Sequence, residues 1–199
     1  MNRISSRLPA AAPLVLRGRR EFCVVLAALA CAAGAPALSE EPIPLEKRIK
    51  AAYLAKLPGY ITWPGSAFAK ANAPLTFGVL GDDQVAAELA PAVAGRDVDG
   101  HPLYVRRLTD GESLNNLQVL FVAGRGRLAE VAKATEKLPV LLVTESEGAL
   151  DRGSVVNFML IDERVKFDIA LDAAEKRGLK LSSRLLGVAH NVRPGSSAP

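Results

Sequence analysis

The chain has 199 residues, of which 49% are hydrophobic and 23% charged, and this fits one globular domain with an ordinary core plus additional segments. Its net charge of +4 arises in residues 1–37, which hold five basic residues and one acidic residue, whereas the remainder has 20 of each sign. This balance argues against a nucleic-acid-binding function, because such domains present a basic patch or arm.

Residues 1–37 have the pattern of a signal peptide for export. Basic residues precede an apolar run over residues 22–33, which is too short to span a bilayer comfortably, and small residues lead to a cleavage site after Ala37. Arg19 and Arg20 resemble a twin-arginine signal, and ordinary secretion is an equally good interpretation.

The cysteines, Cys23 and Cys31, both lie in this segment, so the mature chain is predicted to have none. Cys31 is an alternative site of lipid attachment, although Ala28 and Leu29 before it form a poor lipobox. A domain of this size can build its core without disulfides.

Residues 41–63 are predicted to form an amphipathic helix. Apolar residues recur at three and four positions, namely Leu45, Ile49, Ala52, Tyr53, Leu57, Tyr60 and Ile61. Pro58 and Gly59 interrupt this pattern, and a proline inside a helix costs roughly 3 kcal/mol. We therefore expect a kink or break near Leu57.

Trp63 is the only tryptophan, and it stands beside Pro64 with Tyr60 and Phe68 nearby. Such an aromatic cluster either fills a core or anchors an interface with another protein. Both interpretations stay open on the residues alone.

The middle of the chain alternates between strands and helices, as parallel sheets do. Strands are expected at residues 75–80, 103–108, 119–122 and 140–143. One helix is expected to begin at the turn after the first strand and to continue to about residue 93, and another to cover residues 128–137. Residues 112–116 are expected to form a turn or a short helix. Right-handed crossovers make 2-1-3-4 the simplest strand order, with helices on both faces.

The last part of the chain is predicted to form a hairpin and two helices. The hairpin strands cover residues 155–161 and 165–169 at one sheet edge, and helices follow at residues 171–177 and 181–189, with Gly178 ending the first. The expected fold is α/β: a single domain over residues 41–192, with a mostly parallel doubly wound sheet, an antiparallel C-terminal hairpin and flanking helices. Residues 193–199 are expected to be a disordered tail.

Residues that carry chemistry are few. His101 and His190 are interpreted as surface or capping residues, with His190 ending the last helix, and Asp82 as a helix cap. Metal-binding, nucleophile-elbow and dinucleotide-binding motifs are absent from the sequence, so we expect no metal, no cofactor and no enzymatic activity. The remaining charged candidates are interpreted as solvated: Arg125 between two turn glycines, and Lys176, Arg177 and Lys180 at a wet helix end.

Two segments of the chain resemble the YfiR family of periplasmic regulators. The opening segment matches at Ala51, Ala52, Tyr53, Leu54, Lys56, Trp63 and Pro64. The closing segment matches at Gly153, Val156, Asn157, Phe158, Phe167, Asp168, Ile169, Gly178, Leu179, Ser183, Leu185 and Leu186. The chain departs from the family pattern at Pro58, Gly59, Ser154 and Ala170, and the last of these replaces an asparagine.

The resemblance implies a non-enzymatic periplasmic protein that restrains a membrane-bound signalling protein, in known cases a diguanylate cyclase, by binding its periplasmic domain. Tyr60, Trp63, Pro64 and Phe68 are then the candidates for partner binding. A membrane kinase as the partner and a homodimer both stay open. One alternative is a small-molecule-binding sensory module with its ligand at the carboxyl ends of the strands, and another is an enzyme of unknown type.

Overall fold

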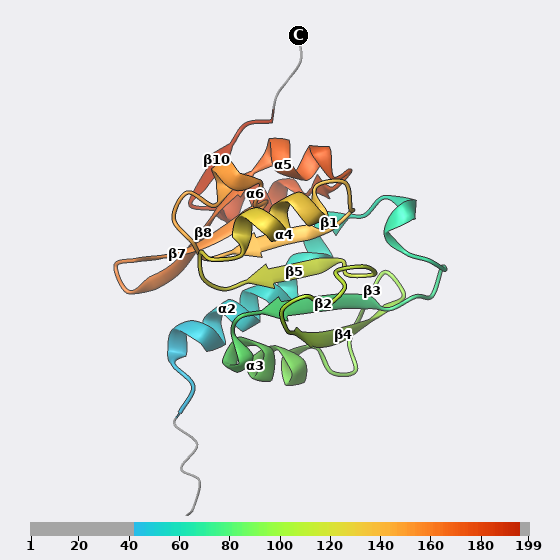
Figure 1. Cartoon of the computed structure of the whole chain (residues 1–199), viewed down its shortest axis with the longest axis horizontal. Helices are drawn as coiled ribbons and strands as arrows, with labels where there is room; N and C mark the ends of the chain where they lie inside the picture. The colour runs from blue at the N-terminus through green and yellow to red at the C-terminus, as the bar shows by residue number, and fades with distance from the viewer. Residues whose placement is uncertain (1–41, 196–199) are drawn as a thin grey trace, which may run out of the picture. The chain divides into compact units, whose positions relative to one another are not determined.

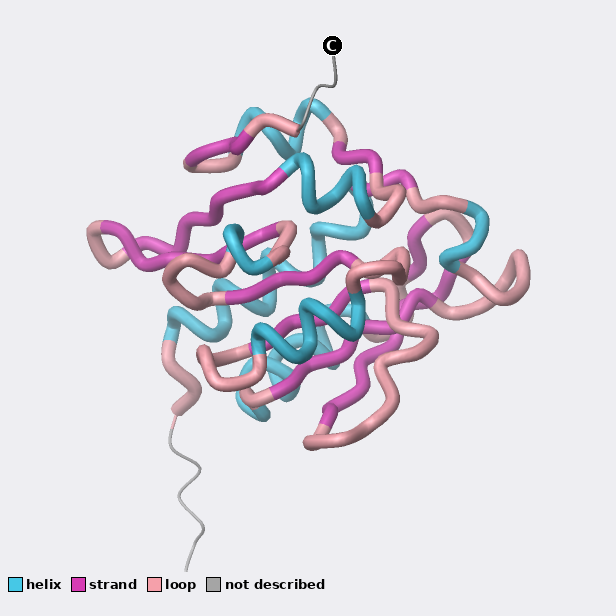
Figure 2. The backbone as a smooth tube through the Cα atoms, turned by 45° about the horizontal axis from the view of Figure 1, so that its top comes forward, coloured by secondary structure: helices cyan, strands magenta, loops and turns pink. Residues whose placement is uncertain are grey.

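A computed structural model describes residues 42–195, which form a mixed α/β domain around an eight-stranded sheet (Figure 1). The strand order is β10-β8-β7-β6-β5-β2-β4-β3, and a separate two-stranded sheet pairs β1 with β9. Helices lie on both faces of the main sheet (Figure 2). The structure thus confirms the predicted fold class, a mostly parallel sheet with an antiparallel hairpin.

The elements have the following bounds. The α-helices are α2 (Leu45–Lys56), α3 (Asp83–Val93), α4 (Leu128–Thr135), α5 (Leu171–Lys176) and α6 (Ser183–Val188). The 3-10 helices are η1 (Leu57–Tyr60), η2 (Gly65–Ala67) and η3 (Leu150–Arg152). The strands are β1 (Ile61–Thr62), β2 (Leu75–Leu80), β3 (Asp97–Val98), β4 (His101–Leu108), β5 (Val119–Val122), β6 (Leu141–Thr144), β7 (Val156–Ile161), β8 (Arg164–Ala170), β9 (Lys180–Leu181) and β10 (Asn191–Arg193).

The centre of the sheet has the predicted order, because β4, β2, β5 and β6 are neighbours and pair in parallel. β2, β5 and β6 are buried along their whole length, as expected for strands that are covered on both faces. Phe77 and Phe121 face one core, to which α2 and α3 contribute. Leu120 faces a second core, into which α4 packs through Leu128.

The hairpin of β7 and β8 pairs in parallel with β6, but it does not form the sheet edge as predicted. β10 pairs with β8 beyond it, so that Asn191 lies opposite Asp168. The predicted last helix was extended too far, since α6 ends at Val188 and His190 leads into β10. Arg193, which the prediction placed in the tail, belongs to β10 as well.

The opening helix breaks where Pro58 and Gly59 predicted a break. α2 ends at Lys56, the chain continues as η1, and the expected helical residues Ile61 and Thr62 instead form β1. The predicted helix over residues 181–189 starts late for a related reason: Leu181 belongs to β9, which pairs with β1. Residues 112–116 form turns and no helix.

Within residues 42–195, no helix has the length and apolar character needed to cross a bilayer. The predicted signal peptide with Cys23 and Cys31, and the last four residues of the predicted tail, lie outside the described residues.

Candidate functional site

The opening and closing segments of the chain meet in space. Ile61 and Thr62 of β1 pair antiparallel with Leu181 and Lys180 of β9. The backbone N–H of Ser182 also donates to the Tyr60 carbonyl at 2.9 Å. The short sheet therefore holds the segment that follows α2 against the segment that follows α5.

The predicted partner-binding residues all lie on or beside this junction, and we call them the η1–η2 surface: Tyr60, Trp63, Pro64 and Phe68. Tyr60 is 38% exposed, and the other three are partly buried. Trp63 and Phe68 contact edge to face, with ring centroids 6.4 Å apart. Phe68 also stacks on the imidazole of His101 at 3.7 Å, so its ring is held between two neighbours.

Trp63 packs against the core, but its indole N–H finds no hydrogen-bond acceptor among residues 42–195. Its ring contacts the core that α2 and α3 share. Among residues 42–195, no acceptor lies within hydrogen-bond distance of its buried indole Nε1. Tryptophans that serve as core residues usually find such a partner.

Three family-motif residues form an aromatic cluster that attaches α2 to the hairpin. The ring centroid of Tyr53 lies 6.0 Å from that of Phe158 and 5.6 Å from that of Phe167. The centroids of the two phenylalanine rings are 6.4 Å apart, with an angle of 90° between the ring planes. Phe158 and Phe167 are buried, whereas Tyr53 is partly exposed. These matches therefore lie in the core, where they position the opening helix.

The two motif glycines are turn residues with left-handed backbone. Gly153 has φ 91° and ends η3, and Gly178 has φ 70° and follows α5, as predicted. Only glycine adopts this conformation without steric cost. Pro64 of the η1–η2 surface lies directly against Gly178.

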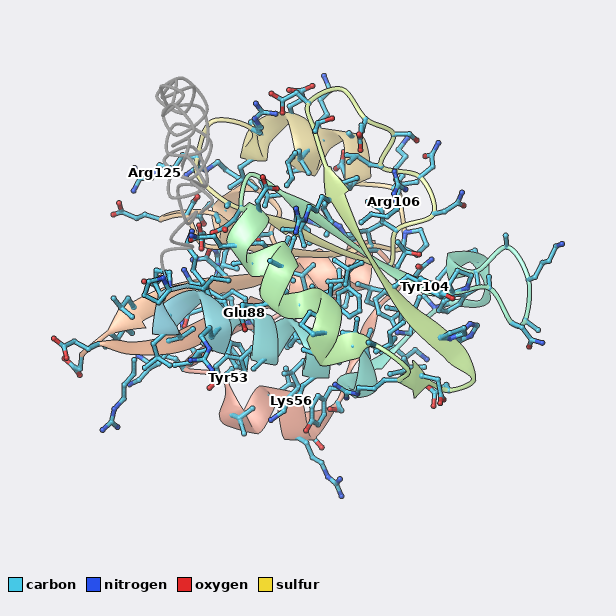
Figure 3. All side chains as sticks on the ribbon, turned by 90° about the horizontal axis from the view of Figure 1, so that it is seen from below. Tyr53, Lys56, Glu88, Tyr104, Arg106 and Arg125 are labelled. Carbon is cyan, nitrogen blue, oxygen red and sulfur yellow. The ribbon has the colours of Figure 1, made fainter. Side chains whose placement is uncertain are left out.

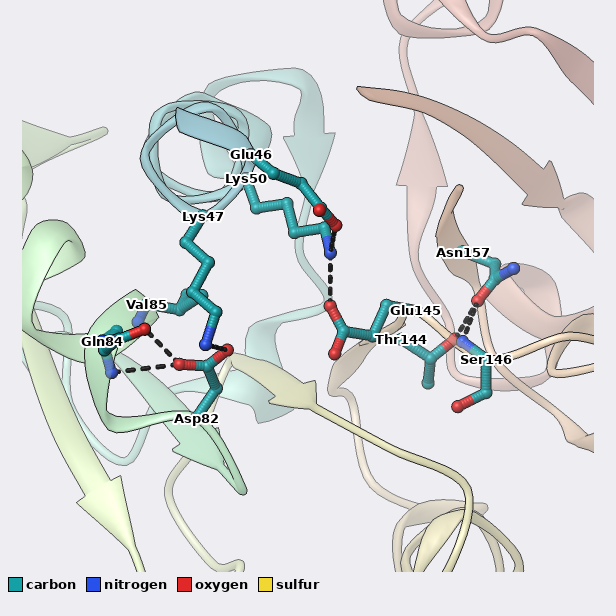
Figure 4. Close-up of polar contacts among 10 residues, drawn as sticks. All are labelled: Glu46, Lys47, Lys50, Asp82, Gln84, Val85, Thr144, Glu145, Ser146 and Asn157. Carbon is teal, nitrogen blue, oxygen red and sulfur yellow. Dashed lines mark hydrogen bonds and ion pairs between the residues drawn. The ribbon is translucent and has the colours of Figure 1, made fainter. Parts of the chain in front are cut away.

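Asn157 joins the ends of β6 and β7 through a buried hydrogen-bond network. Its Oδ1 accepts from the Thr144 hydroxyl at 2.7 Å and from the Ser146 backbone N–H at 3.0 Å. Because a backbone N–H can only donate, the amide orientation is fixed, and Nδ2 points away from both bonds (Figure 4). Ser154 continues the network, with its hydroxyl 2.8 Å from that of Thr144.

Two lysines of α2 reach the carboxyl ends of the strands (Figure 4). Lys47 pairs at 2.8 Å with Asp82, which caps α3 by accepting from two backbone N–H groups, as predicted. The buried Lys50 pairs at 2.6 Å with Glu145, which follows β6, and also with Glu46. Burial lowers the pKa of Lys50, but the two carboxylates outweigh it, so the pKa is raised.

A cavity of about 570 Å³ lies beside this edge. Its lining includes Glu145, Asn157, Asp168, Arg125 and Arg193. Doubly wound sheets commonly bind ligands at this position.

At the charged end of α5, the structure contradicts the prediction of a solvated side chain for one of the three residues, Arg177. Arg177 is only 6% exposed, because its side chain folds back over α5 and donates to the Ala173 carbonyl at 3.1 Å. Lys176 and Lys180 are exposed as expected. Arg125 is solvated too, and it pairs with Glu147.

The histidines have structural contacts. His101 Nδ1 lies 2.7 Å from the Ala73 carbonyl, and His190 Nδ1 lies 3.0 Å from Asp168. In residues 42–195, no group of three or more His, Cys, Asp or Glu side chains could hold a metal.

A family model described as YfiR/HmsC-like matches residues 47–190, which include both the η1–η2 surface and the aromatic cluster. The chain belongs to the YfiR/HmsC-like family. YfiR/HmsC-like proteins in general regulate diguanylate cyclase signalling, are regulators rather than enzymes, are generally periplasmic, and generally interact with a membrane signalling protein.

One solved structure that matches the chain is that of a conserved domain protein from Vibrio cholerae O1 biovar El Tor strain N16961. It shares 10% identity with this YfiR/HmsC-like chain, with a TM-score of 0.49, over 77% of this chain and 61% of that chain. The chain thus spans less than two thirds of that protein's length. No curated protein matches the chain significantly.

The sequence did not single out Lys50 or Glu145, and it predicted a solvated Arg177. Glu46 and Lys50 are four residues apart, and this spacing in a helix was a local signal for the ion pair between them. The pairing of Lys50 with Glu145 joins residues 95 positions apart, and no local pattern indicates it.

Proposed function

We propose that this chain is an exported, non-enzymatic regulator that binds and restrains a membrane-bound signalling protein, a diguanylate cyclase, through the η1–η2 surface. The observation that carries the proposal is the meeting of the two family segments at β1 and β9, where Tyr60 and Trp63 flank β1. Aromatic residues on a rigid support are typical anchors of protein interfaces.

Three contacts hold the η1–η2 surface in place, which favours binding of a partner without rearrangement. β9 pairs with β1, Pro64 lies against Gly178, and the Phe68 ring stacks on His101. Side chains that are ordered before binding lose less conformational entropy when a partner arrives. Trp63 Nε1 has no hydrogen-bond partner within residues 42–195, which supports the same interpretation, because a tryptophan that serves as a core residue usually has one.

Replacement of Trp63 by alanine tests the proposal. A true interface tryptophan commonly contributes more than 2 kcal/mol, so binding should weaken at least about thirtyfold. We would measure thermal unfolding of the variant, its binding to the solubilised membrane partner, and cellular cyclic-di-GMP. Tyr104→Ala is the matched control, because Tyr104 is a 59% exposed aromatic residue on β4, outside the η1–η2 surface (Figure 3).

A folded Trp63→Ala protein that no longer restrains its partner supports the proposal if Tyr104→Ala still does. A variant whose melting temperature is far below that of the wild-type protein would show that Trp63 is a core residue, since truncation of a core tryptophan destabilises the fold by about 3–5 kcal/mol. Full restraint by a folded Trp63→Ala protein refutes the η1–η2 surface as the contact.

Export is the second part of the proposal, and it is supported by the sequence of residues 1–37. We expect N-terminal sequencing of periplasmic protein to start after Ala37. A lipid on Cys31 would instead move the cleavage site, and protein found only in the cytoplasm would refute export.

The absence of catalysis can be tested directly. We expect purified protein to show no turnover of ester, phosphate or nucleotide substrates above background. Turnover that disappears on replacing Asp82 or His101 alone would contradict a purely regulatory function.

A second candidate function, a small-molecule-binding sensory module, is favoured by the cavity of about 570 Å³ at the carboxyl edge. Asn157 lines it, and its Nδ2, which points away from Thr144 and Ser146 (Figure 4), could donate to a ligand. Co-purification of a small molecule that is lost on replacing Asn157 would favour this candidate.

A further inference from the structure

Arg177 is a buried charge that has no carboxylate partner in the described part of the chain. Among residues 42–195, its guanidinium forms no salt bridge, and its one hydrogen bond is the donation from Nη1 to the Ala173 carbonyl. Its Nε is buried and has no acceptor among the same residues. The bond to Ala173 is a normal way to satisfy the end of a helix, but it accounts for only one of the guanidinium nitrogens.

This situation is costly in free energy. A buried ion is tolerated when it is paired and its donors are satisfied, as Lys50 is by Glu46 and Glu145. Arg177 lacks such compensation, and burial accordingly lowers its pKa, an effect that the charge of nearby Glu136 only partly opposes. An oxyanion beside the guanidinium would supply the missing charge and acceptors.

The guanidinium lies on the wall of a cavity of about 410 Å³ between α4, η3 and α5, which we call the Arg177 cavity. A Cβ on Gly153 would stand 3.9 Å from Nη2, so the glycine leaves room beside this nitrogen. The size is within the range of small-molecule sites.

The charge around the Arg177 cavity also favours an anion. Its cationic lining residues are Lys133, Arg152, Lys176 and Arg177, and its acidic ones are Glu136, Asp151 and Asp172. Two of the carboxylates are engaged, because Asp172 pairs with Lys176 and Asp151 pairs with Arg193. Arg152 donates to the Glu147 and Gly148 carbonyls. Lys133, Arg152 and Lys176 are exposed, so Arg177 is the one buried cation among the lining residues.

We propose that the Arg177 cavity binds a small-molecule oxyanion, the phosphate or carboxylate group of a small ligand, with the Arg177 guanidinium as its main contact. The planar fork of an arginine matches both groups bidentately, and Nη2 beside Gly153 offers the approach. The site is separate from the η1–η2 surface, so it can be tested without knowledge of the signalling partner.

The test is calorimetric titration of the purified full chain with inorganic phosphate and, separately, with acetate, at constant ionic strength. We expect saturable binding of at least one probe, and the tighter probe identifies the group as phosphate or carboxylate. Arg177→Met should weaken binding by more than about tenfold, and Arg177→Lys should weaken it as well, because lysine lacks the fork. Glu136→Gln should strengthen binding, because it removes a competing negative charge.

Two further variants keep the test decisive. Lys180→Met is the control, since Lys180 is an exposed lysine outside the lining of the cavity, and it should change the affinity by less than about threefold. Ala129→Phe places a ring at the exposed wall of the cavity, and it should block binding even if Arg177→Met fails to fold. The proposal is wrong if neither probe saturates below about 10 mM, or if binding survives in Ala129→Phe and in a folded Arg177→Met.

Discussion

Pro64 lies against the turn at Gly178, where an added Cβ would stand 3.5 Å from Pro64 Cγ. One residue belongs to the opening segment of the chain and the other to the closing segment, 114 positions later in the sequence. The contact places the η1–η2 surface on a turn whose backbone only glycine adopts readily.

Gly178→Ala should therefore destabilise the protein. The distance to Pro64 is an ordinary van der Waals contact, so the cost comes from the positive φ, which disfavours alanine by about 1–2 kcal/mol. Chemical denaturation measures the change in the free energy of unfolding. Gly187→Ala is the control, because Gly187 lies in α6 with open space around it, and alanine there should be neutral or stabilise by up to about 1 kcal/mol. Equal effects of the two substitutions would show that the turn conformation is unimportant.

Asn157→Ala should cost about 1–3 kcal/mol of unfolding free energy, because it leaves the Ser146 N–H and the Thr144 hydroxyl without their acceptor. Asn191→Ala on β10 tests the same change at an exposed position, and it should have little effect. Urea denaturation of both variants gives the comparison. A loss below about 0.5 kcal/mol for Asn157→Ala would contradict the importance of this network.

Lys50→Met should destabilise the protein by roughly 1–3 kcal/mol, because Glu145 would remain in place without its cation. The value is below that of a fully buried pair, since the Glu145 side chain keeps 21% exposure. Adding Glu145→Gln removes the uncompensated charge, and the double variant should recover part of the loss. No recovery in the double-mutant cycle would show that the two side chains are not energetically coupled.

Stability should also depend on Lys50 at alkaline pH. The folded-state pKa of Lys50 is raised, so the ion pair stabilises the fold fully below the unfolded pKa of about 10.4, and this contribution is lost as pH rises through the folded-state value. Wild-type protein should therefore lose more stability than Lys50→Met between neutral pH and the highest pH at which both still fold. Parallel curves for the two proteins would contradict this assignment.

The central sheet could be predicted because its signals are local. Apolar runs such as that of β2, the cap at Asp82 and the short links between elements restrict the topology, and the order of β4, β2, β5 and β6 follows from them. Val165, Phe167 and Ile169 alternate with polar residues, and this local pattern matches the buried face of β8.

The candidate site was predictable only as a set of residues. Tyr60, Trp63, Pro64 and Phe68 are close in sequence, so their clustering was visible, but the contact with Gly178 and the stacking of Phe68 on His101 were not. Both depend on where β9 and β4 bring distant segments.

The sequence by itself determined the fold class, the break at Leu57, the cap at Asp82 and the family, because each of these depends on spacing within a short window or on a motif. Only the tertiary structure decided that β1 and β9 pair, that β10 covers the hairpin, and that Arg177 is buried. The physical reason is that strands of two or three residues have no periodicity of their own, and whether a charged side chain is exposed depends on the elements that pack around it.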